Sequence, residues 1–288
     1  MLSVRRATVL LAASVLVLAG CGGGPGPASS SASSPSASAR SSESGPPVTT
    51  APPTTTPPTT TPPPTAEPPA PATTAPVVVI DPGHNGGNAA APAVVDAPVP
   101  DGTGGTKPCN TTGTSTDAGY AEHSFTWDTS LRLRDLLTAA GVQVVLTRPD
   151  DTGVGPCVDV RGQLGAQVGA AAFVGVHGDG AAPGSRGFHV ITSSRDPGGA
   201  EVAASTQALA VALRDALTAV EPVSDYLGTD GLDSRPDLAG LNLNTVPAVY
   251  VECGNMRNAA DAALMSSPEG RQALAQQLAT GVLAFLDR

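Results

Sequence analysis

Residues 77–84 read Val77-Val78-Val79-Ile80-Asp81-Pro82-Gly83-His84. The first four residues form a short, continuous apolar run, which is typical of a buried strand. Asp-Pro-Gly then ends the strand in a turn. A histidine, which can bind a metal ion or transfer a proton, follows at once. The segment therefore predicts a buried strand that carries a reactive side chain just beyond its carboxyl end.

The chain after this strand alternates between helical and strand patterns. Helices are expected over residues 122–140, 160–171, 199–220 and 268–286, and strands over residues 142–147, 172–176, 187–192 and 247–252. Strands that alternate with helices predict an α/β fold with a mostly parallel sheet. We expect a single domain over residues 77–288, with a twisted sheet of about six strands and helices on both faces.

Three residues suited to metal chemistry fall at the carboxyl ends of predicted strands. His84 follows the first strand, His177 follows the strand over residues 172–176, and Glu252 ends the last strand. Ligands of open α/β sheets bind beyond the carboxyl ends of the strands. The order of elements therefore predicts that these three side chains meet at one rim of the sheet.

Such a set of residues fits hydrolysis by a bound zinc ion. A hydrolytic zinc site needs three protein ligands and an open position for a water molecule, whose pKa the metal lowers to about 7. Two imidazoles and one carboxylate are a common ligand set. A further carboxylate that does not bind the metal must move protons to the leaving group.

Five segments resemble the zinc-dependent N-acetylmuramoyl-L-alanine amidases with a type 3 catalytic domain. They are Asp-Pro-Gly-His-Asn-Gly (81–86), Gly-Tyr-Ala-Glu (119–122), Gly-Val-Gln-Val-Val-Leu-Thr-Arg (141–148), Val-His-Gly-Asp (176–179) and Val-Pro-Ala-Val-Tyr-Val-Glu-Cys-Gly-Asn-Met-Arg-Asn (246–258). The resemblance spans residues 77–286. It implies a hydrolase that cleaves the amide bond between N-acetylmuramic acid and the L-alanine of the stem peptide in peptidoglycan.

The resemblance also implies roles for single residues. His84, Glu122 and His177 would bind one Zn²⁺ per chain, and Glu252 would be the catalytic carboxylate. The residues by themselves support Glu122 more weakly, because a carboxylate at a helix start is also favoured by the helix dipole. His123 neighbours Glu122 but points about 100° away from it on a helix, so we expect no metal binding there.

The other histidine, His189, lies in a strand that is expected to run away from the rim, and we expect it to be packed rather than bound to metal. Asp81 could orient a metal ligand by a hydrogen bond or simply form an Asp-Pro turn. Asn85 and Arg148 are expected near the metal or the substrate. Arg148, like Arg161, could contact a stem-peptide carboxylate or be solvated.

Asp179 departs from the resemblance, because the family often has asparagine at this position. A carboxylate there accepts hydrogen bonds but does not donate them. We therefore expect contacts between Asp179 and the substrate that differ from those of relatives.

The first 76 residues have a different composition. Arg5 and Arg6 precede an apolar run that ends in Leu-Ala-Gly-Cys at residues 18–21. This pattern predicts a lipoprotein signal peptide over residues 1–21 with lipidation at Cys21, and a plain secretory signal is the alternative. Residues 22–76 are rich in Ser, Pro and Thr, which predicts a disordered linker. We expect an extracytoplasmic protein that is lipid-anchored to the membrane and faces the cell wall, or else is secreted.

The remaining cysteines predict one disulfide. Cys109 and Cys157 lie in polar loops, whereas Cys253 ends an apolar strand. In an exported chain two of the three should pair, so we expect a Cys109–Cys157 disulfide and a buried free thiol at Cys253. Residues 86–119 have no strongly amphipathic run, so we expect no inhibitory helix there. We expect this segment to form a mobile wall of the cleft that the disulfide holds in place.

The net charge of −10 and the lack of a basic patch argue against a nucleic-acid partner. We expect peptidoglycan and, through Cys21, the membrane as partners, and a monomeric chain. The need for a protein activator is left open. The alternatives are a zinc peptidase that acts on the stem peptide and a non-catalytic lipoprotein that binds the cell wall. The second is disfavoured because a binding protein does not need Glu252.

Overall fold

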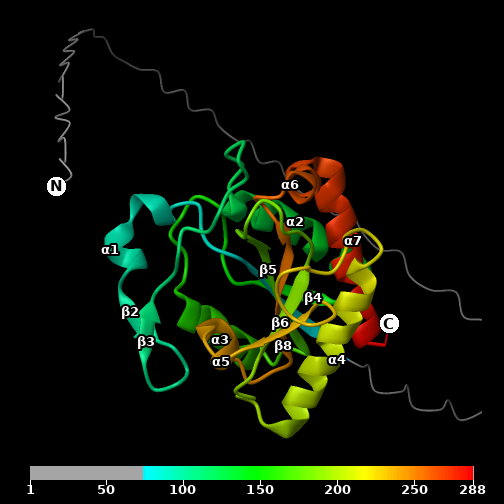
Figure 1. The fold of residues 1–288 in the computed structure, drawn as a ribbon. Helices are drawn as coiled ribbons and strands as arrows, with labels where there is room; N and C mark the ends of the chain where they lie inside the picture. The colour runs from blue at the N-terminus through cyan, green and yellow to red at the C-terminus, as the bar shows by residue number, and fades with distance from the viewer. Residues whose placement is uncertain (1–73, 288) are drawn as a thin grey trace, which may run out of the picture. The chain divides into compact units, whose positions relative to one another are not determined.

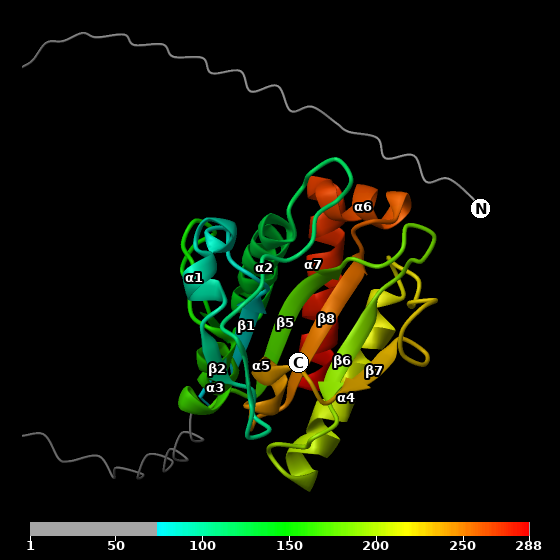
Figure 2. The same ribbon diagram turned by 60° about the vertical axis from the view of Figure 1, so that its left-hand side comes forward.

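The computed structural model describes residues 74–287, so Cys21 and most of the predicted linker lie outside the described residues. A six-stranded sheet with the order β4-β1-β5-β8-β6-β7 forms the centre of the domain (Figures 1 and 2). Its strands are β1 (Val77–Pro82), β4 (Gln143–Leu146), β5 (Ala172–Asp179), β6 (His189–Ser193), β7 (Leu232–Arg235) and β8 (Ala248–Asn255). Within this sheet, only the pairing of β6 with β8 is antiparallel. The predicted fold class is confirmed.

Helices cover both faces of the sheet. The helices α2 (Glu122–Ala139), α4 (Ala200–Leu217) and α7 (Pro268–Phe285) pack on one face, and α3 (Val158–Gln167) and α5 (Ala239–Asn242) pack on the other. Val78 and Ile80 belong to the first core, whereas Val79 belongs to the second. Because β1 is buried on both sides, its sequence is a continuous apolar run rather than an alternating one.

The parallel strands bring their carboxyl ends to one edge. Asp81 pairs with Gly175 across β1 and β5, and His177 pairs with Glu252 across β5 and β8. The first strand leads directly to His84, while α2 begins with Glu122. The four residues predicted to carry the chemistry thus come from four different segments that end or begin at the same edge.

The segment between β1 and α2 contains short elements. They are η1 (Asn88–Ala90), α1 (Pro92–Val95) and a hairpin of β2 (Pro98–Pro100) and β3 (Thr106–Pro108). The Cys109–Cys157 disulfide joins the end of this hairpin to the start of α3. Both the predicted disulfide and the buried free thiol of Cys253 are confirmed.

Several elements are not evident in the sequence pattern. The strand β7 reads Leu-Asp-Ser-Arg and has no apolar run, because it lies at the edge of the sheet. The helix α6 (Ala259–Ser266) depends on a local cap, in which Asn258 accepts hydrogen bonds from the amides of Ala260 and Asp261. Across residues 74–287, no helix has both the length and the apolar character required to cross a bilayer.

Candidate metal centre and active site

His84, Glu122 and His177 converge on one point at the rim of the sheet. His84 Nε2 and His177 Nδ1 each lie 3.1 Å from Glu122 Oε1. One ligand atom from each of the three residues lies within 4.8 Å of the others. Two imidazoles and one carboxylate in this arrangement match the protein ligands of a catalytic zinc site. The structure therefore brings together the three residues that the resemblance implies as metal ligands.

The chain around His84 fixes the orientation of its ring. Its Nδ1 lies 3.1 Å from the carbonyl oxygen of Thr111, which can accept the Nδ1 proton and leave Nε2 facing Glu122. A β-carbon on Gly83 would lie 2.5 Å from His177 Cε1, so only glycine lets the two histidines approach in this way. The ring centroids of His84 and His177 are 5.1 Å apart.

Glu122 is buried and is held by two backbone amides. Its Oε1 accepts a hydrogen bond from the amide of Gly178 at 3.1 Å, and its Oε2 accepts one from the amide of Thr114 at 2.8 Å. Burial alone would raise the pKa of Glu122, but the adjacent imidazoles of His84 and His177 outweigh burial and hold the pKa below its ordinary value. Glu122 is therefore an anion whose charge is directed toward both histidines.

Glu252 lies on the strand next to His177 and lacks the support that Glu122 has. Its Oε2 is buried and has no hydrogen-bond partner among the described residues. Burial, together with the nearby carboxylates of Glu122 and Asp179, raises the pKa of Glu252 well above its ordinary value. A buried carboxyl group without a partner is suited to exchanging a proton with water or substrate.

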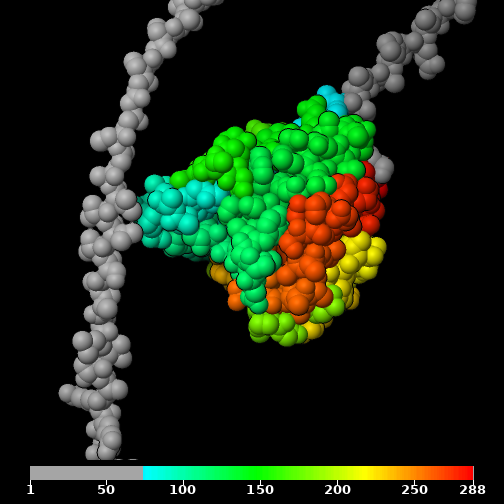
Figure 3. All heavy atoms as spheres, turned by 90° about the horizontal axis from the view of Figure 1, so that it is seen from above, coloured from blue at the N-terminus to red at the C-terminus, as the bar shows by residue number. Residues whose placement is uncertain are grey.

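A cleft of about 390 Å³ contains His84, Glu122, His177 and Glu252. Its wall from the segment before α2 is formed by Lys107, Pro108, Asn110, Thr111, Gly113 and Thr114. Figure 3 looks onto this end of the domain, where the green segment before α2 lies beside the orange segment around α6. Asp117 and Arg257 join these two segments at 2.8 Å. The loop is thus a wall of the cleft, as expected, while its mobility stays a prediction.

Asp81 does not hydrogen-bond to either histidine in the described structure. Its carboxylate accepts hydrogen bonds from Thr147 and from Arg161 Nη1, the latter at 2.8 Å, and both Asp81 and Arg161 are buried. Arg161 also donates to the carbonyl oxygen of His84 at 2.8 Å. Asp81 thus acts on His84 through Arg161, which holds the turn after β1.

Two residues expected near the metal or the substrate have side chains that are turned into the protein. Asn85 is 2% exposed, and its Oδ1 accepts a hydrogen bond from Arg161. Arg148 is 1% exposed and donates to the carbonyl oxygens of Pro82, at 3.0 Å, and His123, at 2.9 Å. Neither residue lines the cleft. Their side chains stabilise the turn after β1 and the start of α2, a role that the sequence pattern did not predict.

Asp179 lines the cleft beside Glu252. Its Oδ2 accepts a hydrogen bond from the hydroxyl of Tyr226 at 2.8 Å, so the carboxylate is used as an acceptor. His189 is 1% exposed and packs edge-on against Tyr226. His123 contacts Asp151 at 2.9 Å rather than the metal ligands. Neither histidine belongs to the cluster that could hold a metal ion.

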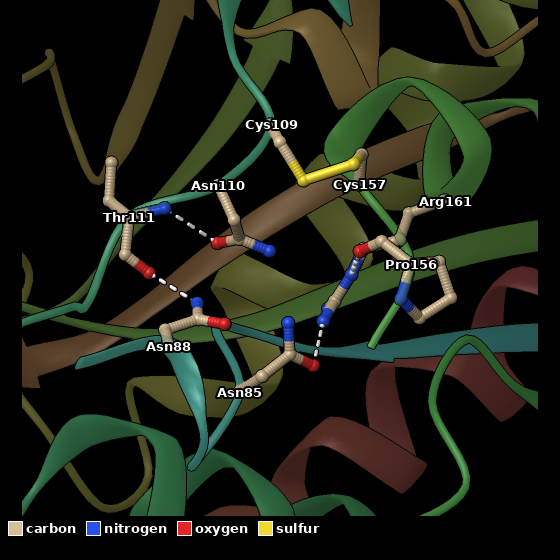
Figure 4. Close-up of a disulfide and its surroundings, with 8 residues drawn as sticks. All are labelled: Asn85, Asn88, Cys109, Asn110, Thr111, Pro156, Cys157 and Arg161. Atoms are coloured by element: carbon tan, nitrogen blue, oxygen red, sulfur yellow. Dashed lines mark hydrogen bonds between the residues drawn. A yellow bond between two sulfur atoms is a disulfide. The ribbon is translucent and has the colours of Figure 1, made fainter. Parts of the chain in front are cut away.

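The disulfide joins the segment that carries Thr111 to the segment that carries Arg161 (Figure 4). Cys109 is followed by Asn110 and Thr111, the residue that contacts His84 Nδ1. Cys157 precedes α3, which carries Arg161. The Cys109–Cys157 bond therefore ties together the two segments that orient His84.

A sequence model described as N-acetylmuramoyl-L-alanine amidase matches residues 78–284. The chain belongs to the N-acetylmuramoyl-L-alanine amidase family. It is 49% identical over 211 residues to the N-acetylmuramoyl-L-alanine amidase Rv3717 of Mycobacterium tuberculosis, and the match covers 73% of this chain and 86% of that protein.

Solved structures of N-acetylmuramoyl-L-alanine amidases share the fold. Ami1 from Mycobacterium smegmatis has 48% sequence identity and a TM-score of 0.71, and the match covers 74% of this chain and 98% of that chain. AmiC2 of Nostoc punctiforme has 24% identity and a TM-score of 0.55, over 74% of this chain and 98% of that chain, and its likeness concerns the fold alone.

The predicted family and enzyme class are confirmed. The chain is an N-acetylmuramoyl-L-alanine amidase, a hydrolase of peptidoglycan. Because its substrate is the cell wall, its role is extracytoplasmic.

Proposed function

We propose that the chain cleaves the amide bond between N-acetylmuramic acid and the L-alanine of the stem peptide, with one Zn²⁺ held by His84, Glu122 and His177 and with Glu252 as the proton-transfer residue. One observation carries this proposal. Three ligand atoms lie within 4.8 Å of one another, and Glu252 pairs with His177 on the neighbouring strand. The site thus separates three metal-binding groups from one carboxyl group that stays free for chemistry.

The residues fit zinc by the chemistry of their donor atoms. Two imidazole nitrogens and one carboxylate oxygen suit zinc and leave a fourth position open. When bound, zinc acts as a Lewis acid that lowers the pKa of water and polarises a carbonyl group. The negative charge of Glu122 also offsets part of the charge of a divalent cation, which supports binding in a buried place.

The chain's own residues provide proton transfer and orientation. Glu252 takes a proton from the attacking water and passes it to the nitrogen of L-alanine, so that the peptide leaves as a neutral amine. The carbonyl of Thr111 and the amides of Thr114 and Gly178 keep two of the metal ligands in place. This preorganisation limits the motion that the site must undergo during the reaction.

Product analysis tests the proposed bond. Peptidoglycan digested by the zinc-loaded chain should release peptides that begin with L-alanine, identified by mass spectrometry. Peptides cut between stem residues would instead support a zinc peptidase. Sedimentation with sacculi and no released product would support a protein that only binds the cell wall.

We also propose that the chain is anchored by lipid at Cys21, that residues 22–76 act as a disordered linker, and that the chain is monomeric. The support is the basic and apolar start of the chain, the Leu-Ala-Gly-Cys sequence and the Ser/Pro/Thr-rich composition. Cells that express C21A should release the protein into the soluble fraction, whereas the unchanged chain should stay with membranes. Equal release of both would leave a plain secretory signal as the explanation.

A further inference from the structure

One end of the cleft carries two cationic side chains that the metal site does not use. Arg235, the last residue of β7, and Lys107 in β3 both line the cleft. Asp237 holds the two cations together. Its backbone carbonyl accepts a hydrogen bond from Lys107 Nζ at 3.1 Å, and its carboxylate accepts two from Arg235, at 3.0 and 2.7 Å.

These contacts leave hydrogen-bond donors unused. Arg235 binds Asp237 through Nε and Nη2, and its Nη1 has no partner among the described residues. Within residues 74–287, the Lys107 ammonium makes one hydrogen bond, although it carries three hydrogens. Burial lowers the pKa of Lys107, as expected for a half-buried cation that is not fully paired. Lys107 and Arg235 therefore bring two positive charges with free donors to this end of the cleft, where Asp237 lines the wall and Asp101 and Asp233 lie nearby.

The other arginines near the cleft already have hydrogen-bond partners within the protein. Arg161 lines it but donates to Asp81, to Asn85 and to backbone carbonyls, and Arg148 is buried behind the turn after β1. Arg235, in contrast, has a side chain that is 38% exposed, and its charge acts on Glu252. The free donor of Arg235 therefore lies within electrostatic reach of Glu252.

We propose that Lys107 and Arg235 bind a free carboxylate of the stem peptide and give the amidase a preference for stems whose second residue carries an α-carboxylate over stems in which that group is a carboxamide. This inference rests on the proposed function. Cleavage places L-alanine at the metal, and the second residue is its direct neighbour on the peptide side. An arginine fork and an ammonium group match the charge and planar shape of a carboxylate, whereas a carboxamide has no negative charge and one acceptor atom fewer.

Two substrates test the preference. They are N-acetylmuramoyl tripeptides with L-lysine as the third residue, and they differ only in D-glutamate or D-isoglutamine as the second residue. The zinc-loaded full chain should hydrolyse the D-glutamate substrate with a kcat/KM at least about tenfold higher, the usual effect of a lost charge-assisted hydrogen bond. Equal kcat/KM values would overturn the proposal, whereas hydrolysis of neither substrate would count against the proposed function itself.

Variants separate binding of the carboxylate from a structural role. R235Q and K107Q should lower kcat/KM for the D-glutamate substrate more than for the D-isoglutamine substrate, and R235K should retain part of the preference. D237N should increase the preference, because Asp237 competes for the same guanidinium. R134Q, on the outer surface of α2, should leave the ratio unchanged. Equal losses on both substrates in R235Q and K107Q, or a D237N ratio at or below that of the unchanged chain, would contradict the assignment.

Discussion

Glu252 differs from two other carboxylates of the site, those of Glu122 and Asp81, in the hydrogen bonds that its carboxyl group receives. Glu122 accepts hydrogen bonds from two backbone amides, and Asp81 accepts them from Arg161 and Thr147. Glu252, in contrast, has one buried oxygen with no partner among the described residues. At the scale of single residues, this difference separates the groups that build the site from the group that we propose to transfer protons.

Replacing Glu252 with Gln should lower kcat by about 10²–10⁴, because the amide cannot transfer protons. Zinc should remain bound, since Glu252 is not among the three clustered ligands. Steady-state kinetics on a muramoyl peptide measures the effect, and E201Q, on the exposed start of α4, is the matched control. Near-normal turnover by a zinc-loaded E252Q protein would remove Glu252 from the mechanism.

A second buried carboxyl group should make stability depend on pH. Burial and the adjacent Asp261 raise the pKa of Glu221 to about 7, although Arg186 acts in the opposite direction. The folded chain therefore keeps a proton on Glu221 that the unfolded chain loses above its ordinary pKa of 4.5. The stability linked to this proton is full below the unfolded pKa and is lost as the pH rises through about 7.

Replacing Glu221 with Gln removes this titration. The variant should be more stable than the unchanged chain at pH 8, by at most about 3 kcal/mol, and the difference should shrink as the pH falls toward 5. Urea denaturation at several pH values measures it, with E201Q as the exposed control. A stability difference that is the same at pH 5 and pH 8 would contradict the assigned pKa.

Residue patterns predicted part of this site. His84, His177 and Glu252 could be predicted because each follows or ends an apolar strand, so their position along the chain fixes their position at the rim. Glu122 could be assigned to the metal only through the resemblance, since nothing local separates a ligand from a helix-capping acid. The role of Arg161 was not predictable, because its partners are mainly backbone carbonyls that meet only in the folded chain.

At the scale of elements, the turn after β1 depends on α3. Arg161 reaches from α3 to Asp81, and both side chains are buried, with 3% and 2% exposed. Arg161 also donates to the backbone of Pro82 and His84. The position of His84 is therefore coupled to the packing of a helix that contributes no residue to the proposed metal site.

Removing one partner of this pair should cost about 3–5 kcal/mol of stability, because a buried charge is left unpaired. R161Q and D81N should each be destabilised to this extent, and the double variant should lose much less than the sum of the two. Urea denaturation of all four proteins measures the coupling. Strict additivity would indicate that the two side chains do not act as a pair.

Most elements could be predicted because burial on one or both faces sets the spacing of apolar residues. This holds for β1, β5 and β8 and for the three long helices. The edge strand β7 and the β2–β3 hairpin could not be predicted in this way, since they bury little and their sequences are polar or rich in proline. The antiparallel direction of β6 also leaves no mark in the sequence pattern.

At the scale of the whole molecule, the sheet brings together groups that lie far apart in the chain. The three proposed metal ligands come from the turn after β1, the start of α2 and the end of β5, and the proposed proton-transfer residue comes from β8. The disulfide closes the loop that carries Thr111 against α3. The site therefore depends on the complete domain, because no single segment contains more than one of its four residues.

The zinc content of the folded chain tests this account most directly. Elemental analysis of the unchanged chain, H177A and E252Q, each confirmed as folded by circular dichroism, measures it. We predict one zinc ion per chain in the unchanged protein and in E252Q, and a large loss of zinc in H177A. Full zinc content in folded H177A, or loss of zinc in E252Q, would contradict the division between metal ligands and proton-transfer residue.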